Sequence, residues 1–550
     1  MSSRLRDACV ASAVAVLLAV TLTWPIAGRL GSAGRIDSGD GRHGVWNVAW
    51  VAHALTTAPS TLFDANIFYP HRQTLAYSES NIIAGLVATP VWAATKNPYA
   101  SYNTVVLLAF AGAALSAFLL VRVIGGSRLG AGVAGVVYGF SPYMFAHVPH
   151  IQLLMTFGPP LSLAAMHHFT KAPSLRRGAL LGVALSVTGL ACAYYGIFAG
   201  LVTGLGLLWN GITQGRLRQA RYWVGALMAV AVVVVMVGPF FVPYLEMREA
   251  GFTRSLDEAR LYSTRGPEYL ASAAWAHRWM LPYLGEWREV LFPGFLPVLL
   301  ATLGVGLAVR AQAPHRDTMA FYIAVAVLAL WISAGPDAGL YSLLYQVVPA
   351  FSFLRAPVRF GVLVGLSAAV LAAMAITWLE RHQMTLRPRF AAALVIIALA
   401  ESWVGPLQLA DAPVVPQAYR RLAGMPRAPV AEFPFFTNAS DRHRHTEYML
   451  MSTFHWQPLI NGYSDHTPAD VAADATALAS FPSSDAWSVL RARGVRWVVV
   501  HFNDYPADVG SVLRPQLQTM PSRLRLVVDE YPVSLYEVIW PRQPGGAPQP

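Results

Sequence analysis

Long apolar runs recur along the first four hundred residues of this chain, and they limit its possible folds more than any other feature. Five examples, each bounded by Arg, Pro or polar clusters, are residues 105–121, 226–241, 291–309, 360–378 and 391–403. A hydrocarbon core about 30 Å thick needs about 20 apolar residues in a helix to cross it. A composition of 55% hydrophobic and 13% charged residues also argues against a soluble enzyme. The sequence therefore predicts a polytopic α-helical membrane protein with about eleven spans.

The formal net charge of +11 comes from short basic clusters between the apolar runs. The clusters are Arg4/Arg6, Arg122/Arg128, Lys171/Arg176/Arg177, Arg216/Arg218/Arg221, Arg310/Arg316 and Arg381/Arg387/Arg389. They fall in every second loop, which is the positive-inside pattern. We therefore expect a multi-pass protein of the plasma (inner) membrane with a cytoplasmic N-terminus. This distribution also argues against nucleic acid as a partner.

The N-terminal segment imitates a signal peptide, because Arg4 and Arg6 precede the apolar stretch 8–22. No convincing small-residue cleavage site follows before Trp24 and Pro25, so we interpret the segment as an uncleaved first span. Cys9 and Cys192 both lie in apolar stretches and indicate neither a disulfide nor a metal site.

The texture of the chain changes at about Asp411, where spanning runs end and charged residues become frequent. We predict a multi-span domain at 1–410, with a long first outer loop at 31–100, and an extracytoplasmic α/β domain at 411–550. Predicted strands of the C-terminal domain are 429–436, 495–502, 526–529 and 534–539, and residues 468–493 have helical periodicity.

The first outer loop contains the densest group of chemically active residues. Asp37 and Asp40 lie among glycines just outside the first span. The same loop contains two helical stretches, 46–55 and 82–92, that we expect at the membrane interface. A carboxylate there can accept a proton from a hydroxyl nucleophile or hold a divalent cation such as Mg²⁺ or Mn²⁺. The alternative is a solvated loop in which Asp37 or Asp40 caps the helix that begins near Trp46.

Two other outer segments carry candidate residues. His147 and His150 are spaced for metal binding, but Pro149 between them disfavours a helix that presents both, so an interfacial or structural role stays open. Arg355 and Arg359 flank Pro357 at the predicted lipid–water boundary. They could clamp a lipid-linked phosphate through bidentate bonds, or simply extend toward lipid headgroups.

Two further patterns have less chemical meaning. Gly130, Gly132 and Gly135 match a dinucleotide-binding spacing, but they lie inside a predicted span, where small residues favour close helix packing. The polar residues at 441–445, with His455, Asp465 and His466, lack metal-site spacing and are interpreted as a polar surface or part of an acceptor site. No Walker or GxSxG sequence occurs, and no nucleotide cofactor is expected.

The order of these features resembles the GT-C class of lipid-phosphate-dependent glycosyltransferases over residues 1–403. The similar features are the acidic first outer loop with interfacial helices, the Pro-containing second outer segment and the outer C-terminal domain. The stretches that are similar to bacterial members are 39–50, 62–64, 67–70, 140–142, 150–152, 354–360 and 448–463. The resemblance implies a GT-C-like fold and an enzyme that takes a sugar from a polyprenyl-phosphate carrier on the extracytoplasmic side.

The resemblance also implies roles for particular residues. An acid of the first outer loop would be the catalytic base or a metal ligand, with Asp40 the first choice and Asp37 the second. Arg355 and Arg359, with Arg254, would hold the departing phosphate. The remaining substrate-binding candidates are His147, His150, Trp46 and Asn47. The partners would be a lipid-linked sugar donor and a glycan, lipid or protein acceptor, and metal dependence stays open.

Two other classes of protein remain as alternatives. A lipid or glycan transporter or flippase would typically show ionisable residues deep within spans and internal hydropathy repeats, and neither is evident here. A non-catalytic membrane protein of envelope assembly is harder to exclude, because an acidic loop alone does not establish catalysis.

Overall fold

The computed structural model describes the whole chain apart from residues 1–2, 250, 252, 310–314, 382–387 and 541–550. The chain divides into two compact units. The helical unit comprises Met1–Arg35, Asn81–Val87 and Asn103–Leu409. The second, mixed unit comprises Ile36–Ser80, Ala88–Tyr102 and Ala410–Pro550, so it joins two segments of the first outer loop to the C-terminal region.

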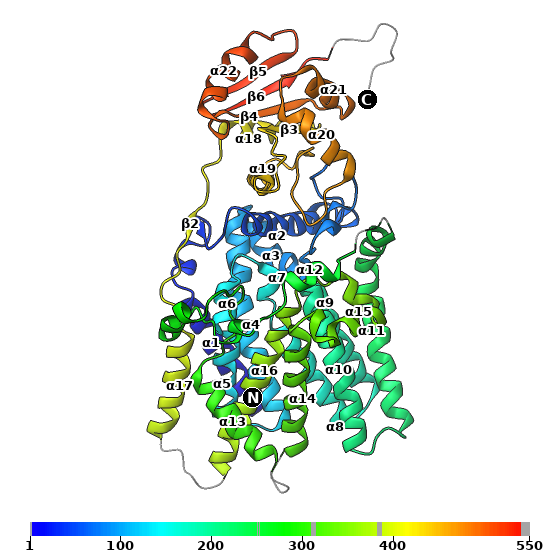
Figure 1. Cartoon of the computed structure of the whole chain (residues 1–550), viewed down its shortest axis with the longest axis vertical. Coiled ribbons are helices and arrows are strands. Elements are labelled where there is room, and N and C mark those ends of the chain that lie inside the picture. Colours follow the sequence, from blue (N-terminus) through cyan, green and yellow to red (C-terminus); the bar gives the residue numbers. More distant parts are fainter. Residues whose placement is uncertain (1–2, 250, 252, 310–314, 382–387, 541–550) are drawn as a thin grey trace. The chain divides into compact units, whose positions relative to one another are not determined.

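The helical unit consists of α-helices joined by short 3₁₀ turns (Figure 1). Its helices are α1 (Ser3–Leu22), α4 (Pro98–Ile124), α5 (Arg128–Gly139), α6 (Pro142–Ala146), α7 (Ile151–Leu154), α8 (Gly158–Lys171), α9 (Leu175–Ala191), α10 (Ala193–Thr213), α11 (Ala220–Glu249), α12 (Leu256–Leu261), α13 (Phe295–Ala308), α14 (Arg316–Ser333), α15 (Leu340–Val347), α16 (Gly361–Arg381) and α17 (Pro388–Ser402). Its 3₁₀ turns are η1 (Ile26–Arg29), η4 (Pro267–Tyr269), η5 (Trp275–Tyr283), η6 (Pro336–Ala338), η7 (Pro349–Phe353) and η8 (Pro357–Phe360), and strand β1 is Ala33–Gly34. The first five residues of α4 belong to the mixed unit.

Six helical segments of the described chain are long and apolar enough to cross a membrane, which confirms the prediction of a multi-pass protein. They are Pro98–Ile124, Arg128–Ala146, Ala193–Thr213, Ala220–Glu249, Arg316–Ser333 and Pro357–Arg381. The predicted count of about eleven is not confirmed. Two of the apolar helices are short: α13 has 14 residues, fewer than the apolar run 291–309 that contains it, and α17 has 15. At 1.5 Å per residue such helices are only about 21–23 Å long, less than the hydrocarbon thickness.

Small residues allow the helices of this unit to approach closely, as predicted for α5. A Cβ atom on Gly130 would lie 2.5 Å from the carbonyl oxygen of Ala373 in α16, and one on Gly135 would lie 2.9 Å from that of Ala114 in α4. Gly132 differs, because a Cβ atom there would meet nothing within 4 Å. Close packing therefore explains two of the three glycines in the dinucleotide-like pattern.

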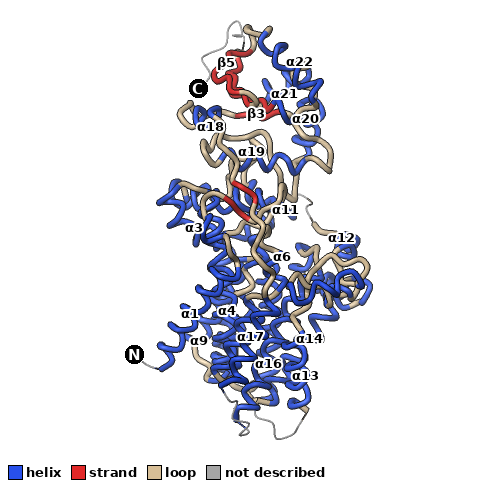
Figure 2. Tube along the Cα trace, turned by 90° about the vertical axis from the view of Figure 1, so that its left-hand side faces the viewer, coloured by secondary structure: helices blue, strands red, loops and turns tan. Residues whose placement is uncertain are grey.

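The mixed unit contains the remaining helices and a four-stranded sheet (Figures 1 and 2). Its helices are α2 (Asp40–Thr57), α3 (Ile82–Thr95, of which the first six residues belong to the helical unit), α18 (Gln417–Leu422), α19 (His445–Ser452), α20 (Ala469–Ala479), α21 (Ser484–Ala492) and α22 (Ala507–Gln518). Its 3₁₀ turns are η2 (Pro59–Thr61), η3 (Thr74–Tyr77), η9 (Arg442–Arg444) and η10 (Phe502–Asp504). Its strands are β2 (Ala410–Asp411), β3 (Val430–Phe433), β4 (Trp497–His501), β5 (Leu524–Glu530) and β6 (Val533–Val538).

The four predicted C-terminal strands are confirmed, and they form one sheet in the order β3-β4-β6-β5. β3 and β4 are parallel, whereas β6 is antiparallel to both β4 and β5. Val498 and Val500 of β4 belong to the core that also contains residues of α20, α21 and α22. Side chains alternate along a strand, so Trp497, Val499 and His501 face the opposite side of the sheet.

The first outer loop is hydrogen-bonded to the C-terminal region within the mixed unit. The backbone N–H of Phe68 donates to Asn461 O (3.0 Å), and that of Tyr69 donates to Leu459 O (2.8 Å). The N–H of Leu459 in turn donates to Asn66 O (2.9 Å). These bonds join parts of the chain that are almost four hundred residues apart, and α2 also packs against α19.

Candidate functional site

The two carboxylates predicted at the first outer loop have different surroundings. Asp37 Oδ1 accepts hydrogen bonds from the backbone N–H groups of Gly39 (3.1 Å) and Gly41 (2.7 Å). A Cβ atom on Gly41 would lie 2.9 Å from Ile36 Cα, so only glycine allows the loop to fold back this tightly. Asp37 therefore caps α2, which begins at Asp40 rather than near Trp46 as predicted.

Asp40 lies in the first turn of α2, next to residues of the C-terminal region. The hydroxyl of Tyr463 donates to Asp40 Oδ1 (3.4 Å). His43 lies one turn further along α2, its ring centre 6.2 Å from that of Tyr463. Burial lowers the pKa of His43, although the charges of Asp40 and Asp465 act in the opposite direction. We call Asp40, His43, Tyr463 and Asp465 the acidic cluster.

Sequence reasoning named Asp40 and, separately, Asp465 as part of a polar surface or acceptor site, but it did not connect the two or identify Tyr463. These partners lie more than four hundred residues from Asp40, so no local spacing connects them. The one sequence signal was indirect, because Tyr463 ends the stretch 448–463 that resembles the glycosyltransferase family.

Trp46 and Asn47 are buried inside the mixed unit. The indole N–H of Trp46 donates to Asn66 Oδ1 (3.2 Å), and Asn47 Nδ2 donates to Glu79 O (3.1 Å). These bonds hold the first outer loop around α2. Contact of either side chain with a substrate stays a prediction.

His445 and His455 of the C-terminal region were predicted to lie on a polar surface, but their side chains are less exposed than that prediction requires. His445 is 3% exposed, with its ring nitrogens next to Phe436 O (3.1 Å) and Asn461 Nδ2 (3.3 Å). Burial lowers the pKa of His445 to about 4 and that of His455 to about 3. Both side chains are therefore neutral at neutral pH and belong to the interior of the mixed unit.

The helical unit holds the predicted phosphate-binding arginines. Arg359 lies in η8, directly before α16, with its guanidinium carbon 4.5 Å from the centre of the Tyr194 ring. Its Nε atom is buried and has no hydrogen-bond partner in the described part of the chain. Such a donor is available to an anion that reaches it.

Arg254 and Arg355 share one carboxylate in the same unit. Glu258 Oε1 lies 3.0 Å from Arg254 Nη1 and 3.9 Å from Arg355 Nη1. The guanidinium of Arg355 also lies 5.6 Å from the centre of the Tyr262 ring, and its backbone N–H donates to the Tyr194 hydroxyl (2.9 Å). We call Arg254, Arg355 and Arg359 the arginine cluster.

His147 has both ring nitrogens engaged in the helical unit. Nδ1 lies 2.9 Å from Tyr143 O, and Nε2 lies 3.2 Å from Glu289 Oε2. Burial alone would raise the pKa of Glu289, but His147, with contributions from Arg359 and His150, lowers it below its ordinary value. Glu289 is thus an ionised carboxylate close to the arginine cluster, and it was not identified from the sequence.

The described residues do not assemble a metal site around these candidates. No group of three or more His, Cys, Asp or Glu side chains in the described residues has an arrangement that could hold a metal ion. His150 lies next to His147, with ring centres 5.9 Å apart, and directly precedes α7. Binding of a divalent cation such as Mg²⁺ or Mn²⁺ therefore stays a prediction.

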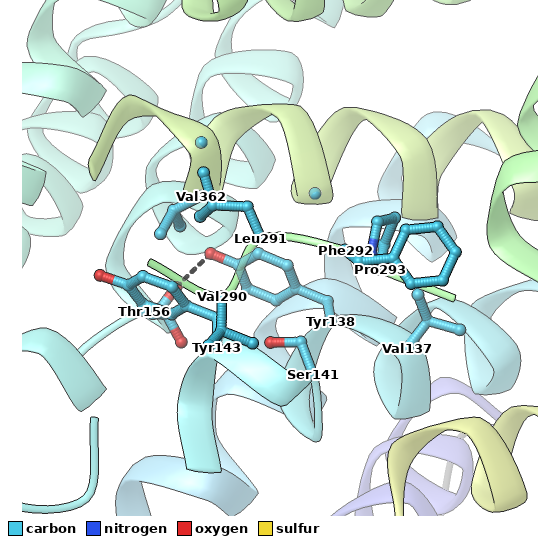
Figure 3. Close-up of a pocket in the computed structure, with 12 residues that line it drawn as sticks. Val137, Tyr138, Ser141, Tyr143, Thr156, Val290, Leu291, Phe292, Pro293 and Val362 are labelled. Atoms are coloured by element: carbon cyan, nitrogen blue, oxygen red, sulfur yellow. Dashed lines mark hydrogen bonds between the residues drawn. The ribbon is translucent and has the colours of Figure 1, made fainter. Parts of the chain in front are cut away.

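A small cavity lies beside Glu289, lined by residues of α5, α6, α16 and the segment 290–293 (Figure 3). Tyr138, Ser141 and Tyr143 provide its polar groups, and the Tyr138 hydroxyl donates to Thr156 O (2.8 Å). Its volume of about 30 Å³ leaves room for only a few water molecules. This cavity is too small for a sugar.

The chain is similar to solved structures of membrane glycosyltransferases of the GT-C type. The oligosaccharyltransferase AglB of Archaeoglobus fulgidus, in complex with an inhibitory peptide and a dolichol-phosphate, has 12% identity and a TM-score of 0.45, covering 91% of this chain and 70% of AglB. A structure of the same organism's enzyme with Zn and sulfate has 11% identity and a TM-score of 0.45, covering 90% and 68%. ArnT of Cupriavidus metallidurans, in the apo state, has 12% identity and a TM-score of 0.38, covering 98% of both chains.

These similarities are too weak to transfer an activity, a substrate or a residue role to this chain. No family model matches the sequence, and no curated protein matches it.

Proposed function

We propose that this protein is a membrane glycosyltransferase that moves a sugar from a polyprenyl-phosphate carrier to an extracytoplasmic acceptor. The acidic cluster is the observation that carries the proposal. It separates two carboxylates that the sequence alone could not distinguish: Asp37 caps α2, whereas Asp40 lies in the first turn with His43, Tyr463 and Asp465. A carboxylate at a helix N-terminus is stabilised in its ionised form, which a general base requires.

In this proposal Asp40 accepts the proton of an acceptor hydroxyl. The hydroxyl oxygen then forms a bond to the anomeric carbon of the donor sugar, and the bond from that carbon to the phosphate oxygen breaks. The electron pair leaves with the polyprenyl phosphate. His43 and Tyr463 would orient the Asp40 carboxylate through the contacts described above.

The departing phosphate gains negative charge, and the arginine cluster supplies the compensating cations. The buried Nε of Arg359, with no partner among the described residues, supports this role most directly. Arg254 and Arg355, which both lie next to Glu258, add further positive charge. The donor would be lipid-linked, so its lipid chain would enter from the membrane rather than through a soluble pocket.

The test is release of free polyprenyl phosphate from synthetic polyprenyl-phosphate sugars by the purified full chain in nanodiscs. Replacing Asp40 by Asn removes the base without changing the size of the side chain. We expect turnover to fall by about 10²–10⁴-fold, the usual contribution of a general base, while the protein stays folded.

Asp508→Asn is the matched control, because Asp508 is also an exposed residue in the first turn of a helix of the same unit, α22. We expect it to retain wild-type turnover. Equal turnover by the wild type and Asp40→Asn would contradict the assignment of the base. A wild type that consumes no donor from a panel of common sugars would favour the transporter or the non-catalytic alternative.

A further inference from the structure

A groove on the helical unit is enclosed by α1, α4 and α5 and has a volume of about 320 Å³. Figure 2 shows α1 beside α4. The middle of the groove is apolar, lined by Val10, Val14, Leu18, Phe118, Gly132 and Phe140. Two of the three helices belong to candidate membrane spans. This apolar lining is suited to binding a hydrocarbon chain.

Packing within the protein does not fill this groove. Gly132 lines it, and a Cβ atom there would meet no atom within 4 Å, whereas Gly130 and Gly135 of the same helix contact neighbouring helices. Val10 and Val14 on the opposite wall are 58% and 49% exposed. Apolar surface of this kind is stabilised when a hydrocarbon chain covers it.

A basic pocket of about 550 Å³ adjoins one end of the groove. Asp7 and Phe118 line both spaces, so the two are adjacent. The charged residues of the pocket are Arg122, Lys171, Arg177 and Asp7, and His168 lies beside them. The single carboxylate interacts with Arg122 (3.8 Å) and with Arg128 (2.8 Å) at the junction.

Backbone carbonyl groups at the helix ends position these cations. Arg122 Nη1 donates to Gly126 O (2.6 Å), Arg177 Nη1 donates to Ala172 O (3.1 Å), and Lys171 Nζ donates to Val123 O. Carbonyls satisfy hydrogen bonds but do not neutralise charge. Among the described residues that line the pocket, three cations lie with one carboxylate, so its lining carries a net positive charge that favours an anion.

The surroundings of His315, next to the pocket, are also positively charged. Its ring lies against Gly125, which lines the pocket, and Arg381 Nη1 is 3.2 Å from its Nε2. Burial lowers the pKa of His315, and the charges of Arg381 and Lys171 lower it further.

We propose that the groove and the basic pocket together bind one anionic phospholipid. An acyl chain would lie against Val10, Val14 and Gly132, and the phosphate would lie among Arg122, Lys171 and Arg177. A free phosphate ester could use only the pocket, and a zwitterionic lipid would bring no net negative charge. This site does not depend on the proposed transfer reaction, because it shares no residue with the acidic or arginine clusters.

The test is native mass spectrometry of the purified full chain titrated with three probes. The probes are phosphatidylglycerol, phosphatidylcholine with the same acyl chains, and glycerol phosphate. We expect phosphatidylglycerol to bind at least about tenfold more tightly than phosphatidylcholine, since each surface cation near an anionic lipid contributes about 1 kcal/mol. Glycerol phosphate should show no binding.

Two variants test the two halves of the site. Arg122→Gln/Lys171→Gln/Arg177→Gln should reduce phosphatidylglycerol binding to the level of phosphatidylcholine. Its control is Arg176→Gln/Arg218→Gln/Arg221→Gln, which removes the same charge from exposed residues that line neither space. Gly132→Leu should weaken the binding of both lipids by filling the groove. Gly204→Leu, at an α10 position that also has nothing within 4 Å, should leave it unchanged.

Equal binding of the two lipids by the wild type would overturn the proposal, as would equal losses in the two triple variants. Unchanged lipid binding by Gly132→Leu would also overturn it. Binding of glycerol phosphate as tight as that of phosphatidylglycerol would assign the pocket to a free phosphate ester. Thermal unfolding of each variant distinguishes lost binding from lost folding.

Discussion

The acidic cluster and the arginine cluster are built in different ways. In the helical unit, the aromatic rings of Tyr194 and Tyr262 position Arg359 and Arg355, and all of these residues lie at helix ends of one compact unit. In the mixed unit, Asp40 lies next to Tyr463, which is more than four hundred residues away along the chain. The arginine cluster thus depends on helix packing, whereas the acidic cluster depends on the docking of the first outer loop to the C-terminal region.

This difference implies that the two clusters can be disturbed separately. A change in the C-terminal region should affect the base and leave the arginines in place. A change at η8 should affect the binding of the donor and leave the stability of the mixed unit unchanged. The predictions below test that separation, in order of decreasing effect.

The largest of these effects is expected at Arg359. Arg359→Gln keeps a polar side chain but removes the charge next to the proposed phosphate site. We expect KM for the polyprenyl-phosphate sugar to rise by about 100-fold, equivalent to about 2.7 kcal/mol, which is within the usual range for loss of one partner of a buried charge pair. Steady-state kinetics in nanodiscs measure this change.

Arg265→Gln is the control for Arg359. Arg265 follows α12 in the same unit, and its pair with Glu286 is exposed and loose (3.7 Å), so its loss should change KM little. An unchanged KM in Arg359→Gln would remove Arg359 from the proposed phosphate site.

The next effect concerns the mixed unit and its buried histidines. Burial lowers the pKa of His445 to about 4, so the folded state binds its proton less well than the unfolded state does. Between the ordinary pKa of histidine, about 6.5, and about 4, the unfolded state therefore binds more protons, and stability falls as the pH falls. At pH 5 the titration of His445 alone should lower the free energy of unfolding by about 2 kcal/mol relative to neutral pH.

Hydrogen exchange of α19 and β3 against pH measures this loss. His445→Asn should make the decline between pH 6.5 and pH 5 smaller by the contribution of this one group, because asparagine does not titrate, while His455 still contributes. The same decline in wild type and variant would show that His445 is not responsible.

The C-terminal strands could be predicted because their signal is local. Strands β3 and β4 are short runs of β-branched and aromatic residues between turn residues, and the sequence placed both within a few positions of their observed ends. The helices α2 and α3 of the first outer loop were also predicted, although α2 begins at Asp40 rather than near Trp46. Local periodicity is sufficient for elements of this kind.

The predicted count of about eleven spans is not confirmed, because hydropathy alone does not determine where a helix begins. The apolar run 291–309 continues through Gly294, which has a φ of +112°, so α13 begins only at Phe295. Hydropathy reports where apolar residues lie, but a backbone turn decides how many of them are helical.

The residues that contact one another within each cluster could not be predicted from the sequence, for a different reason. Glu289 pairs with His147, and Tyr463 contacts Asp40, across separations that no spacing rule covers. The same limit applied to the two carboxylates of the first outer loop. Only the backbone N–H groups at Gly39 and Gly41 distinguish the capping role of Asp37 from the surroundings of Asp40.

The smallest effect is expected at Asp37, and it separates the two candidate bases. Asp37→Asn keeps a side-chain oxygen that can accept the N–H groups of Gly39 and Gly41, so α2 should keep its cap and turnover should change little. Asp37→Ala removes the acceptor and should destabilise the start of α2 by about 1 kcal/mol, the usual value of an N-terminal cap. Hydrogen exchange of the amides at Gly39 and Gly41 should then be faster in Asp37→Ala only. A general base would give the opposite pattern, because an amide cannot accept the proton whatever its geometry. If Asp37→Asn abolished turnover while these two amides stayed protected, Asp37 rather than Asp40 would be the base.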